Sequence, residues 1–122
     1  MNYLFLAYGD EQWLDALSPG EREAFEIACT TQDEVLRKSG YLIAVQPLQS
    51  SRTATTVRAR NGKVSLSDGP YAQTKEQLIR LFFVDARDLN EAIRVASTMP
   101  QARGGAIEVR PVNMFDWMQE GE

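Results

Sequence analysis

Short apolar runs and amphipathic segments alternate along the chain, and together they predict an α+β fold. An apolar run bounded by turn residues is typical of a buried strand, whereas apolar residues at three- and four-residue steps are typical of a helix face. The strands expected on this basis are residues 2–8, 41–45, 53–60, 63–67, 78–84 and 106–110. The expected helices are residues 19–39 and a segment capped by Asp88 and ended by Pro100, with a short helical turn over residues 11–17.

Local signals mark the ends of several of these elements. Ser18-Pro19-Gly20-Glu21 combines a capping hydroxyl, a proline suited to the first helical turn and an acid, so it predicts the start of the long helix. Asn61-Gly62 predicts a two-residue hairpin turn. Arg103-Gly104-Gly105 predicts a flexible loop, and an anion site built from its backbone N–H groups is the less favoured alternative.

The order of elements is strand, helix, strand, hairpin, strand, helix, strand. This order matches a ferredoxin-like plait, βαββαβ with an added β-hairpin, and the length predicts one domain over residues 1–122. Such a plait leaves one sheet face open, and the strands over residues 2–8 and 78–84 are apolar on both faces, so we expect a homodimer through that face. An aspartate at Phe82 would disrupt the dimer if Phe82 lies there. The alternative cover is the chain's own segment 112–118, with Phe115 and Trp117.

The composition excludes several kinds of chemistry. The chain has no histidine and a single cysteine, Cys29, which excludes a histidine-based triad, a His-ligated metal, an intrachain disulfide and a Cys-rich zinc site. Cys29 lies on the apolar stripe of the long helix, and we expect a buried, inert thiol. We therefore expect no cofactor and no metal.

Charge and the N-terminal segment bear on partners and location. The net charge is −4, although residues 35–67 hold six bases and no acid. Nucleic acid is an unlikely partner on these grounds, since the whole protein is acidic and the basic segment lacks interleaved aromatic residues. The N-terminal apolar run lacks a basic flank and is too short to span a membrane, so we expect a cytoplasmic protein without a membrane partner.

One segment is similar to a known protein family. Asp68-Gly69-Pro70-Tyr71 and the residues up to Gln77 resemble the YCII-related family, in particular its DGPF subgroup, which is named for Asp-Gly-Pro-Phe. The opening Tyr-Leu-Phe-Leu-Ala-Tyr-Gly-Asp, the Thr-Ala-Thr-Thr-Val-Arg before the hairpin turn and the closing Gly-Gly-Ala-Ile-Glu-Val-Arg-Pro-Val extend the resemblance over nearly the whole chain. Tyr71 departs from the motif, which has phenylalanine there.

The resemblance implies a dimeric α/β barrel of ferredoxin-like subunits, and it implies little about function. An enzymatic role has been suggested for some YCII-like members that carry a His-Asp pair, and this chain, which has no histidine, cannot form that pair. DGPF domains that occur with extracytoplasmic-function sigma factors suggest a regulatory role instead.

Polar residues around the motif form the candidate site. Glu76 and Asp68 are the candidate catalytic residues, since a carboxylate that is desolvated or close to another carboxylate can act as a general base near neutral pH. The candidate ligand-binding residues are Tyr8, Tyr71, Lys75, Arg80 and Arg110. A structural alternative also explains the motif: Asp68 accepts backbone N–H bonds, Gly69 adopts an unusual φ and Pro70 stiffens the turn.

Three classes of function stay open at this point. The protein is a metal-free enzyme acting on a small molecule, a dimer that binds a small anionic ligand near the motif, or a non-catalytic interaction module of sigma-factor-dependent transcription. The sequence does not decide whether it is an enzyme.

Overall fold

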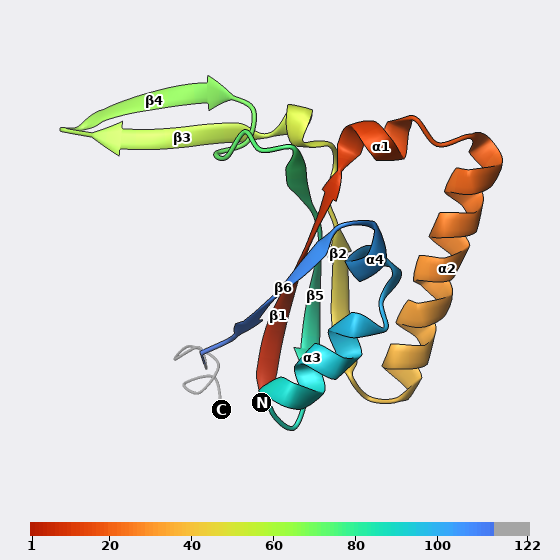
Figure 1. Ribbon diagram of the computed structural model, residues 1–122. Coiled ribbons are helices and arrows are strands. Elements are labelled where there is room, and N and C mark those ends of the chain that lie inside the picture. Colours follow the sequence, from red (N-terminus) through yellow and green to blue (C-terminus); the bar gives the residue numbers. More distant parts are fainter. Residues whose placement is uncertain (114–122) are drawn as a thin grey trace.

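The fold is built on a four-stranded antiparallel sheet (Figure 1). The computed structural model describes residues 1–113. The strands of the sheet, in the spatial order β2-β5-β1-β6, are β2 (Leu42–Pro47), β5 (Glu76–Asp85), β1 (Asn2–Asp10) and β6 (Ala106–Pro111). Each neighbouring pair is antiparallel. With the helices described below, this arrangement confirms the predicted α+β class and is consistent with a ferredoxin-like fold.

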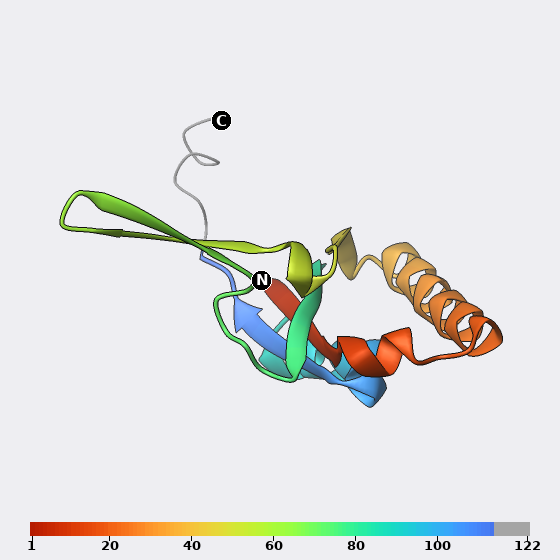
Figure 2. The same cartoon turned by 90° about the horizontal axis from the view of Figure 1, so that it is seen from above.

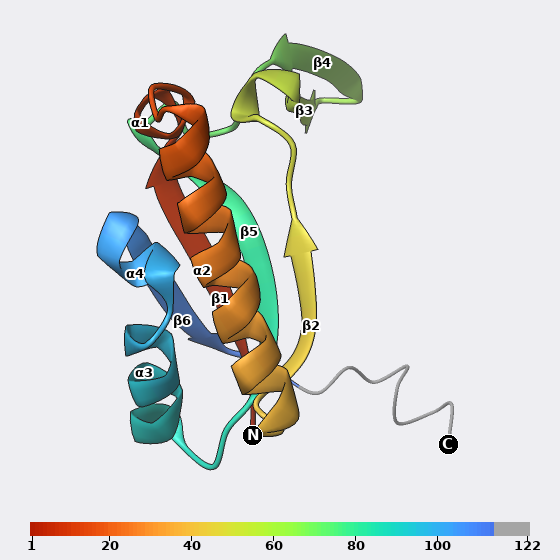
Figure 3. The same ribbon diagram turned by 90° about the vertical axis from the view of Figure 1, so that its right-hand side faces the viewer.

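The helices cover one face of this sheet (Figure 3). Helix α2 (Pro19–Lys38) packs beside β2, while α3 (Leu89–Ser97) and α4 (Pro100–Gly104) pack over β6 and β1. The short helix α1 (Glu11–Asp15) follows β1 directly. None of the helices within residues 1–113 is long and apolar enough to cross a membrane.

Two helix starts show how local signals work in this chain. The Ser18 hydroxyl accepts a hydrogen bond from the Glu21 backbone N–H, and the Glu21 carboxylate accepts one from the Ser18 N–H, which confirms the predicted start of α2. Pro100 does not merely end the second helix, because it begins α4, where its missing N–H is not needed. Arg103 is consequently helical, and the predicted flexible loop was wrong at that position.

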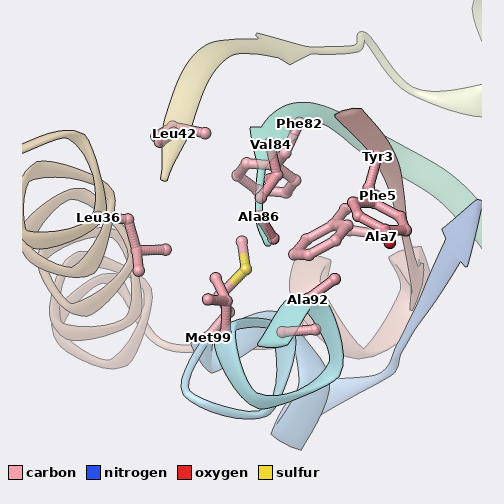
Figure 4. Close-up of a cluster of buried hydrophobic side chains, with 12 residues drawn as sticks. Tyr3, Phe5, Ala7, Leu36, Leu42, Phe82, Val84, Ala86, Ala92 and Met99 are labelled. Atoms are coloured by element: carbon pink, nitrogen blue, oxygen red, sulfur yellow. The ribbon is translucent and has the colours of Figure 1, made fainter. Parts of the chain in front are cut away.

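The hydrophobic core lies between the sheet and the helices (Figure 4). Its largest side chains are almost fully buried: Tyr3, Phe5, Phe82, Val84 and Met99. Successive side chains of a strand point to opposite faces, so the burial of Phe82 turns Phe83 away from the helices. An aspartate at Phe82 would therefore disrupt the core and would not test the open face.

The sheet face opposite the helices carries an apolar patch. The register pairs Leu4 with Phe83 and Leu6 with Leu81, which brings these side chains together at the centre of the sheet. Phe83 exposes 39% of its surface. No helix of the described residues covers this patch (Figures 1 and 3). The alternative cover, residues 112–118, lies outside the described residues except for its first two positions.

The hairpin does not join the four-stranded sheet. Strands β3 (Thr55–Arg60) and β4 (Lys63–Asp68) form a separate two-stranded ribbon that follows a short 3₁₀ turn, η1 (Ser51–Thr53). Its turn residues Asn61 and Gly62 have φ values of 53° and 77°, which confirms the predicted hairpin turn. The ribbon projects from the end of the sheet on the side away from α2 (Figures 1 and 2). We call residues 55–68 the arm.

Candidate functional site

A hollow of about 950 Å³ lies at the end of the sheet where β1 ends and β5 begins. Antiparallel pairing sets Asp10 opposite Glu76, so polar residues that are distant in the sequence meet there. Helices α1 and α4 supply the remaining wall through Trp13 and Arg103. We call it the motif-side hollow, and its chemically active lining residues are Tyr8, Asp10, Trp13, Lys75, Glu76 and Arg103.

The charges around the motif-side hollow are only loosely paired. Lys75 Nζ lies 3.8 Å from Asp10 Oδ2, and because the Lys75 side chain is 82% exposed the pair contributes little to stability. No acid within residues 1–113 forms a salt bridge with Arg103. The Trp13 ring stands edge-on to Phe25 at 6.3 Å between centroids and stays 47% exposed. The hollow therefore offers two cations, two carboxylates and part of an indole surface to a ligand.

Tyr8 connects this hollow to the open sheet face. Its hydroxyl donates a hydrogen bond to Glu108 Oε1 at 3.3 Å, and Arg110 Nη1 donates to the other oxygen of Glu108 at 3.1 Å. Burial raises the pKa of Tyr8, the charge and hydrogen bond of Glu108 raise it further, and Arg110 opposes the rise. Tyr8 is thus a neutral phenol at neutral pH. Arg110 does not line the hollow, and it is linked to the hollow only through its bond to Glu108, which in turn accepts a hydrogen bond from Tyr8.

The motif turn supports the arm. Gly69 has a φ of 105°, which confirms the unusual φ expected there, and its N–H donates to the Ala54 carbonyl at 2.7 Å. The Thr56 hydroxyl donates to the Gly69 carbonyl at 2.9 Å. Within residues 1–113 the Asp68 carboxylate accepts no hydrogen bond, so the bonds expected of it are not made and Thr56 holds the turn instead.

Tyr71 also lies at the base of the arm. Its ring is 79% exposed, and the Arg58 guanidinium lies above it at 5.2 Å from the ring centroid. This distance is within the range of a cation–π contact. Tyr71 therefore lies beside the arm and Asp68 is its last residue, and neither belongs to the lining of the motif-side hollow.

Arg80 points to the face of the sheet that the helices cover. Its Nη1 lies 3.7 Å from Oδ2 of the buried Asp33 on α2. Burial raises the pKa of Asp33, and the positive charge of Arg80 opposes that rise. Together with Cys29 and Gln101, Arg80 lines a separate hollow of about 260 Å³ between α2 and the sheet. The structure does not bring Arg80 to the motif-side hollow.

Cys29 occupies the position expected from the apolar face of α2. It is a free cysteine with only 4% of its surface exposed, and burial raises the pKa of its thiol. A low thiolate fraction and poor access both slow its reactions. Within residues 1–113 no three side chains of the metal-ligating acidic, cysteine or histidine types converge on one point.

Of the candidate residues, the structure brings Tyr8, Lys75 and Glu76 together in one hollow. The sequence interpretation did not name Asp10 or Trp13 among the candidate site residues, and it assigned Arg103 to a loop. The predicted strand order held a usable signal for Asp10, because the end of the first strand and the start of an antiparallel neighbour share one sheet edge. No comparable signal exists for Arg103, whose place depends on how α4 packs.

The fold and this hollow define an α+β protein with an open apolar sheet face and a polar hollow at its strand ends. The model of the YCII-related domain matches residues 1–116 of the chain. An uncharacterised protein of Rhizobium meliloti (strain 1021) is 32% identical over 117 residues, with 94% of each chain covered. The chain belongs to the YCII-related family. The name of this relative states no activity.

Proposed function

We propose that this protein binds a small organic anion in the motif-side hollow. The observation that carries the proposal is the guanidinium of Arg103, which pairs with no acid among residues 1–113, in the same hollow as the partly exposed Trp13. A guanidinium fits a carboxylate or phosphate group through two hydrogen bonds, and a planar group packs well on an indole ring. The proposed ligand therefore carries a carboxylate or phosphate and a planar apolar part. The Lys75 ammonium group adds further hydrogen-bond donors.

Acid–base catalysis is a separate proposal, in which Glu76 accepts a proton from the bound ligand. Glu76 lines the hollow, so it can contact a ligand there, as a general base must. Asp68 lies at the base of the arm and does not line the hollow, so Glu76 is the only carboxylate that this proposal uses. Binding does not depend on this step.

We also propose that the protein is a homodimer through its open sheet face, in the dimeric α/β barrel that the family resemblance implies. The patch of Leu4, Leu6, Leu81 and Phe83 supports this, because an apolar sheet face of this kind usually packs against another surface. Tyr8 belongs both to the hollow and to this face, so the proposed ligand would lie beside the subunit contact. Membership of the DGPF subgroup and a cytoplasmic location stay predictions from the sequence.

A non-catalytic module of sigma-factor-dependent transcription is the alternative proposal, and it rests on the family resemblance alone. Co-purification of a sigma factor with the tagged protein would support it. A ligand that binds tightly in the motif-side hollow would favour the first proposal.

Titration calorimetry with phenyl phosphate, inorganic phosphate and phenol tests anion binding. Phenyl phosphate combines both proposed features, so it should bind at least about tenfold more tightly than inorganic phosphate, a difference of about 1.4 kcal/mol. Arg103→Gln should weaken phenyl phosphate binding by about tenfold or more, because a charge-assisted hydrogen bond is lost. Arg60→Gln on the arm is the control, since it removes the same charge outside the hollow.

Two outcomes contradict the proposal. The first would be that none of the three probes binds at millimolar concentration. The second would be that Arg103→Gln and Arg60→Gln weaken binding equally, which would indicate a general effect of net charge.

A further inference from the structure

The two faces of the arm differ in chemistry. The register pairs Val57 with Leu66 and Ala59 with Val64, so these apolar side chains share one face, which we call the apolar stripe. Val57, Val64 and Leu66 expose 60%, 68% and 68% of their surfaces. The other face carries only polar residues: Thr56, Arg58, Arg60, Lys63, Ser65 and Ser67.

The chain's own contacts lie on the polar face. The Thr56 hydroxyl donates to the Gly69 carbonyl, and the Arg58 guanidinium lies over the Tyr71 ring, so the motif turn supports the arm from that side. The apolar stripe therefore faces away from the motif turn, and its large side chains are mostly exposed to solvent within residues 1–113.

An arm of this kind needs a partner. An isolated two-stranded ribbon is marginally stable in water, and a bare apolar stripe invites association. The arm projects on the side of the open sheet face, away from α2 (Figures 1 and 2). Six residues at about 3.3 Å each span roughly 20 Å, whereas packed sheets lie about 10 Å apart, so the arm extends past a sheet that packs on the open face.

We propose that the apolar stripe packs against a second copy of the chain, so that the arm clasps the partner subunit. The inference rests on the homodimer proposed above and adds a second contact to it. A second copy suits a permanently exposed stripe, because it is present whenever the chain is made.

The area of the open face supports a second contact. Four strands at a spacing of about 4.8 Å, each contributing about six residues, cover a flat face of roughly 400 Å². A standard interface buries about 800 Å² per partner, so the sheet face supplies about half of it. The arm offers roughly 200 Å² of its own, and the partner's arm covers a similar area, which together bring each subunit to about the standard size.

Light scattering over a range of concentrations tests the inference with two neighbouring variants on β4. Leu66→Glu would bury an unpaired carboxylate at the contact, so its dimer dissociation constant should rise by at least about tenfold. Ser65→Glu adds the same charge on the opposite, polar face, and its dissociation constant should stay within about twofold of the parent. Circular dichroism checks that both variants fold. The parent should have twice the mass of the 13.7 kDa chain.

Hydrogen exchange of the unmodified protein gives an independent measurement. The amides of residues 55–68 should exchange more slowly above the dissociation constant than below it, because dimerisation covers the arm.

The outcomes separate the arm from the dimer itself. A dimer that Leu66→Glu leaves unchanged but Phe83→Asp dissociates would overturn the clasp while the sheet-face dimer stands, and the stripe would then belong to the chain's own C-terminal segment or to a different protein. Hydrogen exchange of the arm amides that does not depend on protein concentration would also overturn the clasp. A parent protein that has the mass of one chain throughout would overturn both proposals.

Discussion

The ionisation of Tyr8 depends on burial and on two charged neighbours with opposite effects. Glu108→Gln should lower the pKa of Tyr8 toward its ordinary value of 10.0, because the negative charge and the accepting carboxylate both disappear. Arg110→Gln should raise this pKa further, since it removes the opposing positive charge. NMR titration of ring-labelled tyrosine measures both shifts, and shifts of the same sign would contradict the arrangement.

The raised pKa of Tyr8 also has a consequence for stability. Because the folded state disfavours the phenolate, the stabilising contribution of Tyr8 is fully present below pH 10.0 and is lost as the pH rises through its folded-state pKa. In Glu108→Gln the two pKa values lie closer together, so the loss of stability above pH 10.0 should be smaller than in the parent.

The buried pair of Arg80 and Asp33 should respond unequally to its two neutralising changes. Arg80→Met leaves a buried carboxylate without its partner and should lower the free energy of unfolding by roughly 3 kcal/mol. Asp33→Asn should leave stability at pH 7 unchanged or higher, because burial disfavours the carboxylate, whose Oδ1 has no hydrogen-bond partner among the described residues. Urea unfolding measures both values.

The pH dependence of Asp33 provides a check. Since its folded-state pKa is raised above 3.8, the group favours folding most strongly below pH 3.8, and that contribution is lost as the pH rises. The advantage of Asp33→Asn over the parent should therefore shrink on acidification. A constant difference between pH 7 and pH 3 would show that the carboxylate is not the cause.

At the scale of elements, the motif turn is a support for the arm. Gly69→Ala should lower the free energy of unfolding by about 1–3 kcal/mol, because a φ of 105° strains any residue with a Cβ atom. Thr56→Val should cost about 1 kcal/mol for its lost hydrogen bond. Asp68→Asn should change stability by less than about 0.5 kcal/mol, because the Asp68 side chain is exposed and accepts no hydrogen bond within residues 1–113. Urea midpoints for the three variants would contradict this ranking if Asp68→Asn were the most destabilised.

At the scale of the whole molecule, Phe82 and Phe83 distinguish the two sheet faces. Phe83→Asp should give a folded monomer, because it puts a carboxylate on the open face, where the second copy is proposed to pack. Phe82→Asp should unfold the chain, since Phe82 is fully buried in the core. Light scattering and circular dichroism separate these results. A Phe83→Asp protein that remains a dimer would exclude the open face as the interface.

The elements of this fold follow from local sequence signals, whereas the site does not. The capping box at Ser18 and the Asn61-Gly62 turn act between neighbours in the chain, so the sequence is enough to locate α2 and the hairpin. The pair of Tyr8 and Glu76 was also within reach, because the strand order places both at one sheet end. The place of Arg103 could not be predicted in this way, because Pro100 can either end one helix or begin another. Only the second case makes Arg103 part of a helix.

The sequence by itself determined the α+β class, the two-sided apolar strands and the buried thiol of Cys29. Only the tertiary structure decided that Phe82 faces the helices, that Arg80 pairs with Asp33 and that the hairpin stands apart as an arm. The physical reason is that alternation along a strand defines two faces without saying which one the helices cover. Strand register and helix packing make that choice, and both depend on contacts between residues far apart in the chain.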